Sequence, residues 1–92
     1  MENPKYVIVE DMGLELPIVF SPILSHFDVV NHLKNFKGCK VVSAGECTPR
    51  CLKGDNTRTW GCWGQSVTLK IKSRNEIDEE ILDKHFNLHS SD

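Results

Sequence analysis

Apolar and β-branched side chains gather in two short runs near the N-terminus, KYVIVE at residues 5–10 and LELPIVF at residues 14–20. Runs of this composition are typical of β-strands, and Asp11, Met12 and Gly13 between them favour a tight turn. The pattern therefore predicts a β-hairpin. Because Pro17 has no N–H to donate to a neighbouring strand, we expect the second strand to lie at the edge of a sheet or to be interrupted there by a bulge.

A helix is predicted over residues 26–36. Ser25 stands at the expected N-cap, and Asp28 follows three residues later in the position of a capping box. Apolar side chains then recur at helical spacing and predict the buried face, which is formed by Phe27, Val30, Leu33 and Phe36. His26 falls largely outside this face.

The clearest alternation of apolar and polar positions lies in residues 60–72, where Val67, Leu69 and Ile71 alternate with polar side chains. This period predicts a strand with one face in the core and one in water. A shorter strand is predicted at residues 40–44, KVVSA. The stretch at residues 48–59 is polar and rich in turn-forming residues, and it predicts a long loop of the kind that is often functional or tied down.

A second helix is predicted after Ser73, which forms an S-x-x-E capping box with Glu76 at the start of an acidic first turn. Its buried side is predicted to contain Ile77, Ile81, Leu82, His85 and Phe86. The element order is therefore β-β-α-β-β-α. It predicts an α+β fold, in which a four-stranded, mostly antiparallel sheet carries two helices on one face.

Length and composition fit one compact unit. With 92 residues, of which 39% are hydrophobic and 26% charged, the chain is expected to form a single domain over residues 1–92. No apolar run approaches the ~18 residues of a membrane span, and the N-terminus lacks the features of a signal peptide. We therefore expect a cytoplasmic protein without a membrane partner.

The charge is unevenly distributed along the chain. A net charge of −2 argues against a protein that binds nucleic acid over its whole surface. Residues 34–58, however, contain six basic side chains against two acidic ones, a local charge of +4. This segment is either an ordinary solvated surface or a binding surface for an anionic partner.

The four cysteines are the first candidates for a special site. Their spacing, Cys39-x7-Cys47-x3-Cys51-x10-Cys62, lacks the two tight pairs of a typical structural zinc site. A zinc site built from these four residues remains an alternative, as does a disulfide from Cys47 to Cys51 or from Cys51 to Cys62. Free thiols are the default in a reducing cytoplasm, so we expect neither a metal nor another cofactor.

Catalytic chemistry has equally little support. Cys47 with His26 or His32 would be the candidate pair for nucleophilic catalysis, but only Arg50 is near enough in sequence to activate the thiol. Glycine motifs that bind phosphate are missing from the sequence. We therefore expect a protein without enzymatic activity.

Two tryptophans follow the basic segment. Trp60 and Trp63 lie close in sequence to Arg50, Lys53 and Arg58. An aromatic and basic patch of this kind suits stacking on bases or anchoring a protein partner, although a tryptophan that fills the core explains at least one of them equally well.

Three segments carry a resemblance to known proteins: KYVIVEDMGLELPIVF at residues 5–20, KVVSAGEC at residues 40–47 and WGCWGQSVTLKIKSR at residues 60–74. Their order resembles small proteins of unknown activity encoded by bacteriophages and prophages, over most of the chain from Lys5 to about Asp83. A compact phage accessory protein without enzyme motifs looks like the inhibitors of host defence, in particular the anti-CRISPR proteins that act on type I surveillance complexes. The resemblance implies a host ribonucleoprotein as partner and carries no site residue over to this chain.

Candidate interface residues are therefore assigned from charge and aromatic character alone. We expect a non-enzymatic inhibitor that binds a type I CRISPR surveillance complex and blocks recognition of target DNA. Its basic residues would touch guide RNA backbone or acidic protein, and its acidic residues would occupy lysines that hold nucleic acid. The candidates are Lys34, Lys37, Lys40, Arg50, Lys53, Arg58, Trp60, Trp63, Glu76, Asp78, Glu79 and Glu80. The alternatives are a small nucleic-acid-binding or regulatory module that uses the basic segment 34–58, and a zinc- or disulfide-stabilised structural domain.

Overall fold

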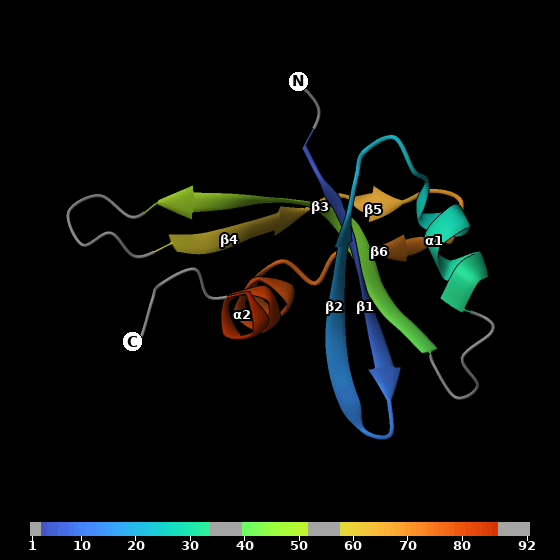
Figure 1. The fold of residues 1–92 in the computed structure, drawn as a ribbon, viewed down its shortest axis with the longest axis horizontal. Coiled ribbons are helices and arrows are strands. Elements are labelled where there is room, and N and C mark those ends of the chain that lie inside the picture. Colours follow the sequence, from blue (N-terminus) through green and yellow to red (C-terminus); the bar gives the residue numbers. More distant parts are fainter. Residues whose placement is uncertain (1–2, 34–39, 52–57, 87–92) are drawn as a thin grey trace.

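The computed structural model of the protein describes residues 3–33, 40–51 and 58–86. In this part of the chain a four-stranded antiparallel sheet, ordered β2-β1-β3-β4, is accompanied by a two-stranded sheet, β5-β6, and by two helices (Figure 1). The elements are β1 (Lys5–Asp11), β2 (Leu14–Phe20), α1 (His26–Leu33), β3 (Lys40–Cys51), β4 (Arg58–Trp63), β5 (Gln65–Ser66), β6 (Ile71–Lys72) and α2 (Glu76–His85). The predicted α+β class and four-stranded antiparallel sheet are confirmed, and the element order matches apart from the added β5-β6 pair.

The predicted hairpin is formed by β1 and β2. Met12 and Gly13 close it with φ angles of 53° and 82°. Two consecutive positive φ angles are what a two-residue hairpin turn of this kind requires, and glycine adopts them at little cost. Within the described sheet β2 pairs only with β1, so Pro17 lies on an edge strand as predicted.

The direction of the Pro17 backbone follows from the hydrogen bonds of the neighbouring strands. Pro4, directly before β1, accepts a hydrogen bond from the amide of Cys47 in β3 at 2.9 Å. Alternate residues of β1, among them Ile8, therefore direct their backbone groups toward β3. Pro17 is paired with Ile8 and so directs its backbone away from β1. Its missing N–H costs no ladder hydrogen bond and removes a donor from the exposed edge.

β3 is the longest strand and connects the two halves of the sheet. Its first half pairs with β1 and its second half with β4. Ile8 lies opposite Ser43 and Val9 lies opposite Val41. Val42 is therefore the extra residue of a β-bulge. The second half of β3 and β4 together form a ribbon that extends away from the hairpin (Figure 1).

Both faces of the sheet are covered. The core on one face lies against α2 and contains the buried residues Tyr6, Ile8, Cys47, Cys62 and Leu82. The core on the other face contains Val7, Val9 and Ala44, and the partly buried residues packed on it include Val29, Val30 and Ile71 from α1 and β6. The prediction that both helices lie on one face is therefore wrong. Because the run at residues 6–9 is apolar at every position, each face of β1 needs its own cover, and α1 and α2 supply one each.

The strand predicted over residues 60–72 is wrong beyond Trp63. β4 ends there, Gly64 turns the chain with a φ of 84°, and β5 and β6 follow with a turn at residues 67–70 between them. Val67 lies in this turn and is 77% exposed. The alternation of apolar and polar residues continues through the turn, so it does not reveal that a short hairpin replaces the single predicted strand. The predicted loop at residues 48–59 is also shorter than expected, because β3 and β4 extend into both ends of it.

The predicted capping box is present at α1. Ser25 Oγ accepts a hydrogen bond from the Asp28 amide at 3.0 Å, and the Ser25 amide donates to Asp28 Oδ2 at 3.2 Å. The helix packs through Val30, as predicted, but its buried side is rotated. His26 is only 6% exposed, whereas Phe27 is 50% exposed, so the prediction is wrong at both positions.

α2 begins later than predicted. Asn75, with a φ of 30°, is its N-cap, and the Ser73 hydroxyl accepts a hydrogen bond from the Asn75 amide at 3.0 Å instead of capping the helix. The predicted buried side is confirmed at Leu82, which is fully buried, and is wrong at Ile77, His85 and Phe86, which are exposed.

Candidate functional site

Asp78 lies in α2 and is fully buried, so the prediction that it contacts a partner is wrong. Its Oδ2 accepts hydrogen bonds from the Tyr6 hydroxyl at 2.5 Å and from the Arg74 amide at 2.9 Å. Its Oδ1 accepts from the Ser43 hydroxyl at 2.8 Å and from Arg74 Nε at 3.0 Å. Four donors, one of them a cation, compensate the burial of this carboxylate.

Arg74 extends this network to the edge strand β2. Its two terminal guanidinium nitrogens donate to the two carboxylate oxygens of Glu15, at 3.2 and 2.9 Å. Such a bidentate pair has a fixed geometry and holds the start of α2 against β2. Burial raises the pKa of Tyr6, and its hydrogen bond to Asp78 raises the pKa further, so the phenol stays protonated. The side chains of Tyr6, Asp78 and Arg74 thus all help to hold α2 on the sheet.

Cys47 and Cys62 lie directly opposite each other in β3 and β4. Their amides donate elsewhere, to Pro4 and Glu79, so the two cysteines form a non-hydrogen-bonded pair. Both are buried free thiols, and burial raises the pKa of each to about 12. The disulfides considered from the sequence, which would join either residue to Cys51, are therefore not formed.

Thiols in this environment are poor nucleophiles and poor metal ligands at neutral pH, because both roles need the thiolate. In the described part of the chain, no group of three or more His, Cys, Asp or Glu side chains is placed to hold a metal ion. Two members of the four-cysteine alternative, Cys39 and the side chain of Cys51, lie outside that part.

Two carboxylates of α2 cover the edge of β4. The Trp60 amide donates to Asp83 Oδ1 at 2.7 Å, and the Cys62 amide donates to Glu79 Oε2 at 2.9 Å. Glu79 and Asp83 are about one helical turn apart, close to the spacing of alternate residues in a strand. The helix therefore occupies the backbone donors through which a further strand would pair. Glu79, a candidate for partner contact, already serves the fold in this way.

Among the basic candidates, the structure describes the side chain of Lys40 and the backbone positions of Arg50 and Arg58. Three others, Lys34, Lys37 and Lys53, lie outside the described residues. Arg50 and Arg58 lie in described strands, but their side chains are outside the described part of the structure. Lys40 is exposed at the start of β3, and Arg50 follows ten residues later in the same strand. An extended strand of this length separates the two by up to about 33 Å. Lys40 and Arg50 are therefore too far apart along β3 to form a single patch by themselves.

The aromatic and acidic candidates are also divided. Trp60 is half-buried against the core on the α2 side, and its ring lies 6.0 Å from that of Phe86. Trp63 is half-buried as well, three residues further along β4, so its side chain belongs to the opposite face. The two rings therefore do not form one platform. Glu76 and Glu80 are exposed on α2.

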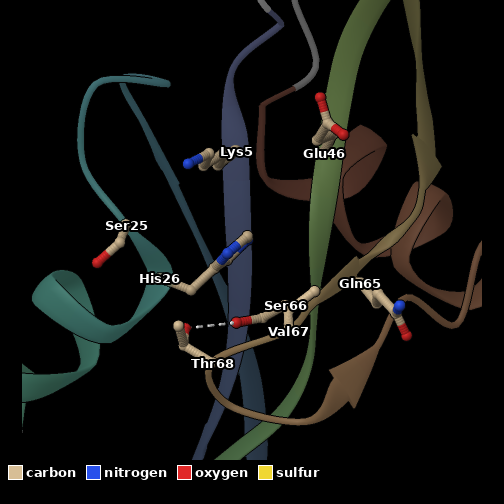
Figure 2. A pocket seen from close by; sticks show the side chains of 8 residues that line it. All are labelled: Lys5, Ser25, His26, Glu46, Gln65, Ser66, Val67 and Thr68. Atoms are coloured by element: carbon tan, nitrogen blue, oxygen red, sulfur yellow. Dashed lines mark hydrogen bonds between the residues drawn. The ribbon is translucent and has the colours of Figure 1, made fainter.

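A cleft of about 240 Å³ lies between the N-terminal end of α1 and the turn that follows β5 (Figure 2). It is lined by Lys5, Ser25, His26, Glu46, Gln65, Ser66, Val67 and Thr68. Lys5 and Glu46 are paired across β1 and β3, but Lys5 Nζ donates to the Leu24 carbonyl, at 3.1 Å. The cleft therefore presents both a positive and a negative side chain to a ligand.

His26 lines this cleft but is held by the fold. Its Nε2 lies 2.9 Å from the Gly45 carbonyl oxygen, and its ring packs edge-on against Phe20 with centroids 5.4 Å apart. Gly45 is required there, because a Cβ at this position would clash with the Trp63 carbonyl oxygen. Burial lowers the pKa of His26, which keeps the imidazole neutral at neutral pH. Cys47 belongs to the core on the opposite face, so the predicted Cys47–His26 pair is not formed.

A second hollow, of about 380 Å³, adjoins the cleft and shares Gln65, Ser66 and Val67 with it. Its remaining lining residues are Lys70 and Lys72. The alternation at residues 67–72 predicts these two lysines on the solvent face of a strand, so they are not among the candidates for binding. The local sequence carries no clear signal for them, because Lys70 and Lys72 alternate with Leu69 and Ile71 as in a strand.

No family model matches the chain, and no match is found among curated proteins or solved structures. Neither helix in the described ranges has the length and hydrophobicity needed to traverse a bilayer.

Proposed function

We propose that the chain is a non-enzymatic inhibitor of phage origin that acts in the host cytoplasm, where it binds a type I surveillance complex and blocks recognition of target DNA. The resemblance of three sequence segments to phage-encoded accessory proteins supports this role. A second observation supports it as well. The side chains best suited to catalysis are buried or hydrogen-bonded within the fold.

The engagement of these reactive groups is the observation that carries the proposal. Asp78 accepts four hydrogen bonds, and His26 is bonded to the Gly45 carbonyl. The thiols of Cys47 and Cys62 have a pKa raised to about 12. The surface of the described chain also exposes large apolar side chains, among them Met12, Ile23 and Val67, which suit contact with a partner.

The two faces of the sheet expose charged groups of different sign, with exceptions such as Lys84 on α2 and Glu46 in the cleft. On one face, α2 carries the exposed side chains of Glu76 and Glu80. On the other, the cleft and the second hollow are lined by Lys5, Lys70 and Lys72. An inhibitor with this division can meet acidic protein or RNA backbone with one face and occupy the lysines of a nucleic-acid channel with the other.

The test is co-elution of the purified chain with a purified type I surveillance complex, followed by a measurement of target-DNA binding by that complex. The proposal predicts a stable association and a loss of DNA binding. The double substitution Glu76→Lys and Glu80→Lys reverses the charge of the exposed side of α2 and should weaken the association. Lys84→Gln, exposed on the same helix, is the matched control. A failure to associate at micromolar concentrations would rule out this partner.

A second candidate function is a small nucleic-acid-binding or regulatory module. It is favoured by the ribbon of β3 and β4, which extends from the molecule and carries Arg50 and Arg58 in its strands (Figure 1). Two-stranded ribbons of this kind fit the major groove of DNA. Binding through phosphate contacts falls steeply with salt, because it releases counterions. Salt-dependent binding to bare DNA or RNA would favour this module over the inhibitor.

A further inference from the structure

We propose that the cleft and the second hollow form one binding surface for an acidic peptide segment of a protein partner. The surface is centred on Ser66 and Val67, which line both hollows, and its basic groups are Lys5, Lys70 and Lys72. The inference rests on the proposed binding role but not on the identity of the host complex.

Charge complementarity identifies the occupant. Three lysines line this surface against a single carboxylate, that of Glu46. Lys5 stands on β1 at one side of the cleft (Figure 2), whereas Lys70 and Lys72 come from the turn and strand β6 beyond Val67. An extended peptide with carboxylates along its length would meet both groups of lysines at once.

Apolar side chains add a second component to this surface. Val67 is 77% exposed where the two hollows join. The segment at the start of α1 exposes Ile23, Leu24 and Phe27 by 88%, 44% and 50%. Leu24 lies beside the cleft, because its carbonyl accepts the hydrogen bond from Lys5. Apolar groups next to lysines suit an acidic segment that also carries an apolar side chain.

The backbone of Lys70 points to a role for its side chain. Lys70 has a φ of 58°, in the left-handed region that favours glycine over residues with a Cβ. The turn is held by its own hydrogen bonds, from the Lys70 amide to the Val67 carbonyl at 3.3 Å and from the Leu69 amide to Ser66 Oγ at 3.2 Å. A lysine at a position suited to glycine indicates that its side chain is used outside the fold.

The lining favours a peptide over a nucleic acid. Among the residues that line the two hollows, the single ring is that of His26, which is buried against Phe20 and cannot stack on a base. Glu46 would repel a continuous phosphate backbone, whereas a peptide can place an amide group beside it.

The test is an NMR titration of the isotope-labelled chain with a short synthetic peptide in which glutamates flank one central leucine. We expect saturable shifts of the amides of residues 65–72 and of Lys5, with a dissociation constant on the order of 0.1 mM, because exposed ion pairs are individually weak. The same peptide with lysine in place of glutamate, and a short single-stranded oligonucleotide, should shift these amides little. A titration without saturable shifts, shifts confined to other residues, or an equal response to the oligonucleotide would overturn the proposal.

Lys70→Gly separates binding from folding. The melting temperature should be unchanged or higher, because glycine adopts a φ of 58° without the steric cost that a residue with a Cβ has there. The affinity for the acidic peptide should fall by about two- to fivefold, the expected effect of one exposed ion pair. Lys84→Gln removes the same charge from α2 on the other face and should leave the affinity unchanged. An equal loss of affinity in both variants would show that the peptide is attracted non-specifically by positive charge. This result would overturn the proposed surface.

The titration needs neither a host complex nor DNA, so its outcome is independent of the test of the proposed function. Saturable peptide binding by a chain that does not associate with the surveillance complex would contradict the inhibitor role alone. Association with that complex by a chain that does not bind the acidic peptide would overturn the surface alone.

Discussion

The phenol of Tyr6 and the carboxylate of Asp78, 72 residues apart in the chain, are joined by a hydrogen bond of 2.5 Å. Tyr6 lies in the central strand β1 and Asp78 in α2, so this bond attaches the C-terminal helix to the middle of the sheet. Ser43 and Arg74 supply the remaining donors. Among the described residues, no buried side-chain nitrogen or oxygen lacks a hydrogen-bond partner. The stability of the fold should therefore depend on this network.

Asp78→Ala should lower the free energy of unfolding by about 2–4 kcal/mol, because it leaves the buried hydroxyls of Tyr6 and Ser43 without this acceptor and removes one partner of the partly exposed Arg74. Tyr6→Phe removes one donor and should lower it by about 1–3 kcal/mol. Urea unfolding followed by tryptophan fluorescence measures both effects. Glu80→Ala, at an exposed position of the same helix, is the control and should change the value by less than about 0.5 kcal/mol. A cost for Asp78→Ala as small as that of the control would show that the network is dispensable.

Stability should fall as the pH drops below about 6.5, the ordinary pKa of histidine, because burial lowers the pKa of His26 in the folded protein. Between the folded and unfolded pKa values, the unfolded chain binds a proton at this residue that the folded chain does not. Protonation therefore favours unfolding, and the stability is fully present above the unfolded value. Urea midpoints measured from about pH 7.5 down to about pH 5 should show this loss. His26→Gln cannot titrate and should flatten the profile; an unaltered slope would refute the assignment.

The amides of Trp60 and Cys62 should exchange slowly with solvent even though β4 is an edge strand of the described sheet. Asp83 and Glu79 accept their hydrogen bonds. Asp83→Ala removes the acceptor of Trp60 and should speed its exchange by about tenfold, the equivalent of about 1.4 kcal/mol. Hydrogen exchange followed by NMR makes this measurement, with Glu80→Ala as control. Rapid exchange of Trp60 in the unsubstituted chain would show that the carboxylate does not cover this edge.

Pro17→Val should keep the fold but raise the tendency of the chain to self-associate. Valine restores an outward-facing N–H in the middle of the edge strand β2, where a second copy could pair. Sedimentation velocity at increasing protein concentration detects the change. Pro17→Lys restores the same N–H but adds a charge that discourages pairing, so it should remain as dispersed as the unsubstituted chain. Equal behaviour of the two variants would indicate that Pro17 has no protective role.

Local signals in the sequence were sufficient for the elements that depend on neighbouring residues. The hairpin followed from its turn residues, the edge position of β2 from Pro17, and the start of α1 from the Ser25–Asp28 box. Asp78 could not be predicted in this way. It is one of several acids in the same helix, and only the distant Tyr6 and its partners distinguish it from the exposed Glu80.

The candidate site was predicted less well than the fold. The basic segment 34–58 was taken as one surface because its residues are close in sequence, but β3 is extended and places Lys40 and Arg50 near its opposite ends. Lys70 and Lys72 were passed over because the alternation around Val67 is typical of a strand. The turn that places them beside the cleft is set by tertiary packing of β5 and β6 against β3, which no local period encodes.

Inhibition by occupation of a surface requires stoichiometric amounts of the chain. The most direct measurement is a titration of the chain into a purified type I surveillance complex, at concentrations well above the dissociation constant, with bound target DNA as the readout. The proposed role predicts a linear loss of DNA binding that ends at a fixed ratio of chain to complex and does not change on longer incubation. A loss that occurs at much lower ratios and grows with time would indicate turnover and contradict the proposed role.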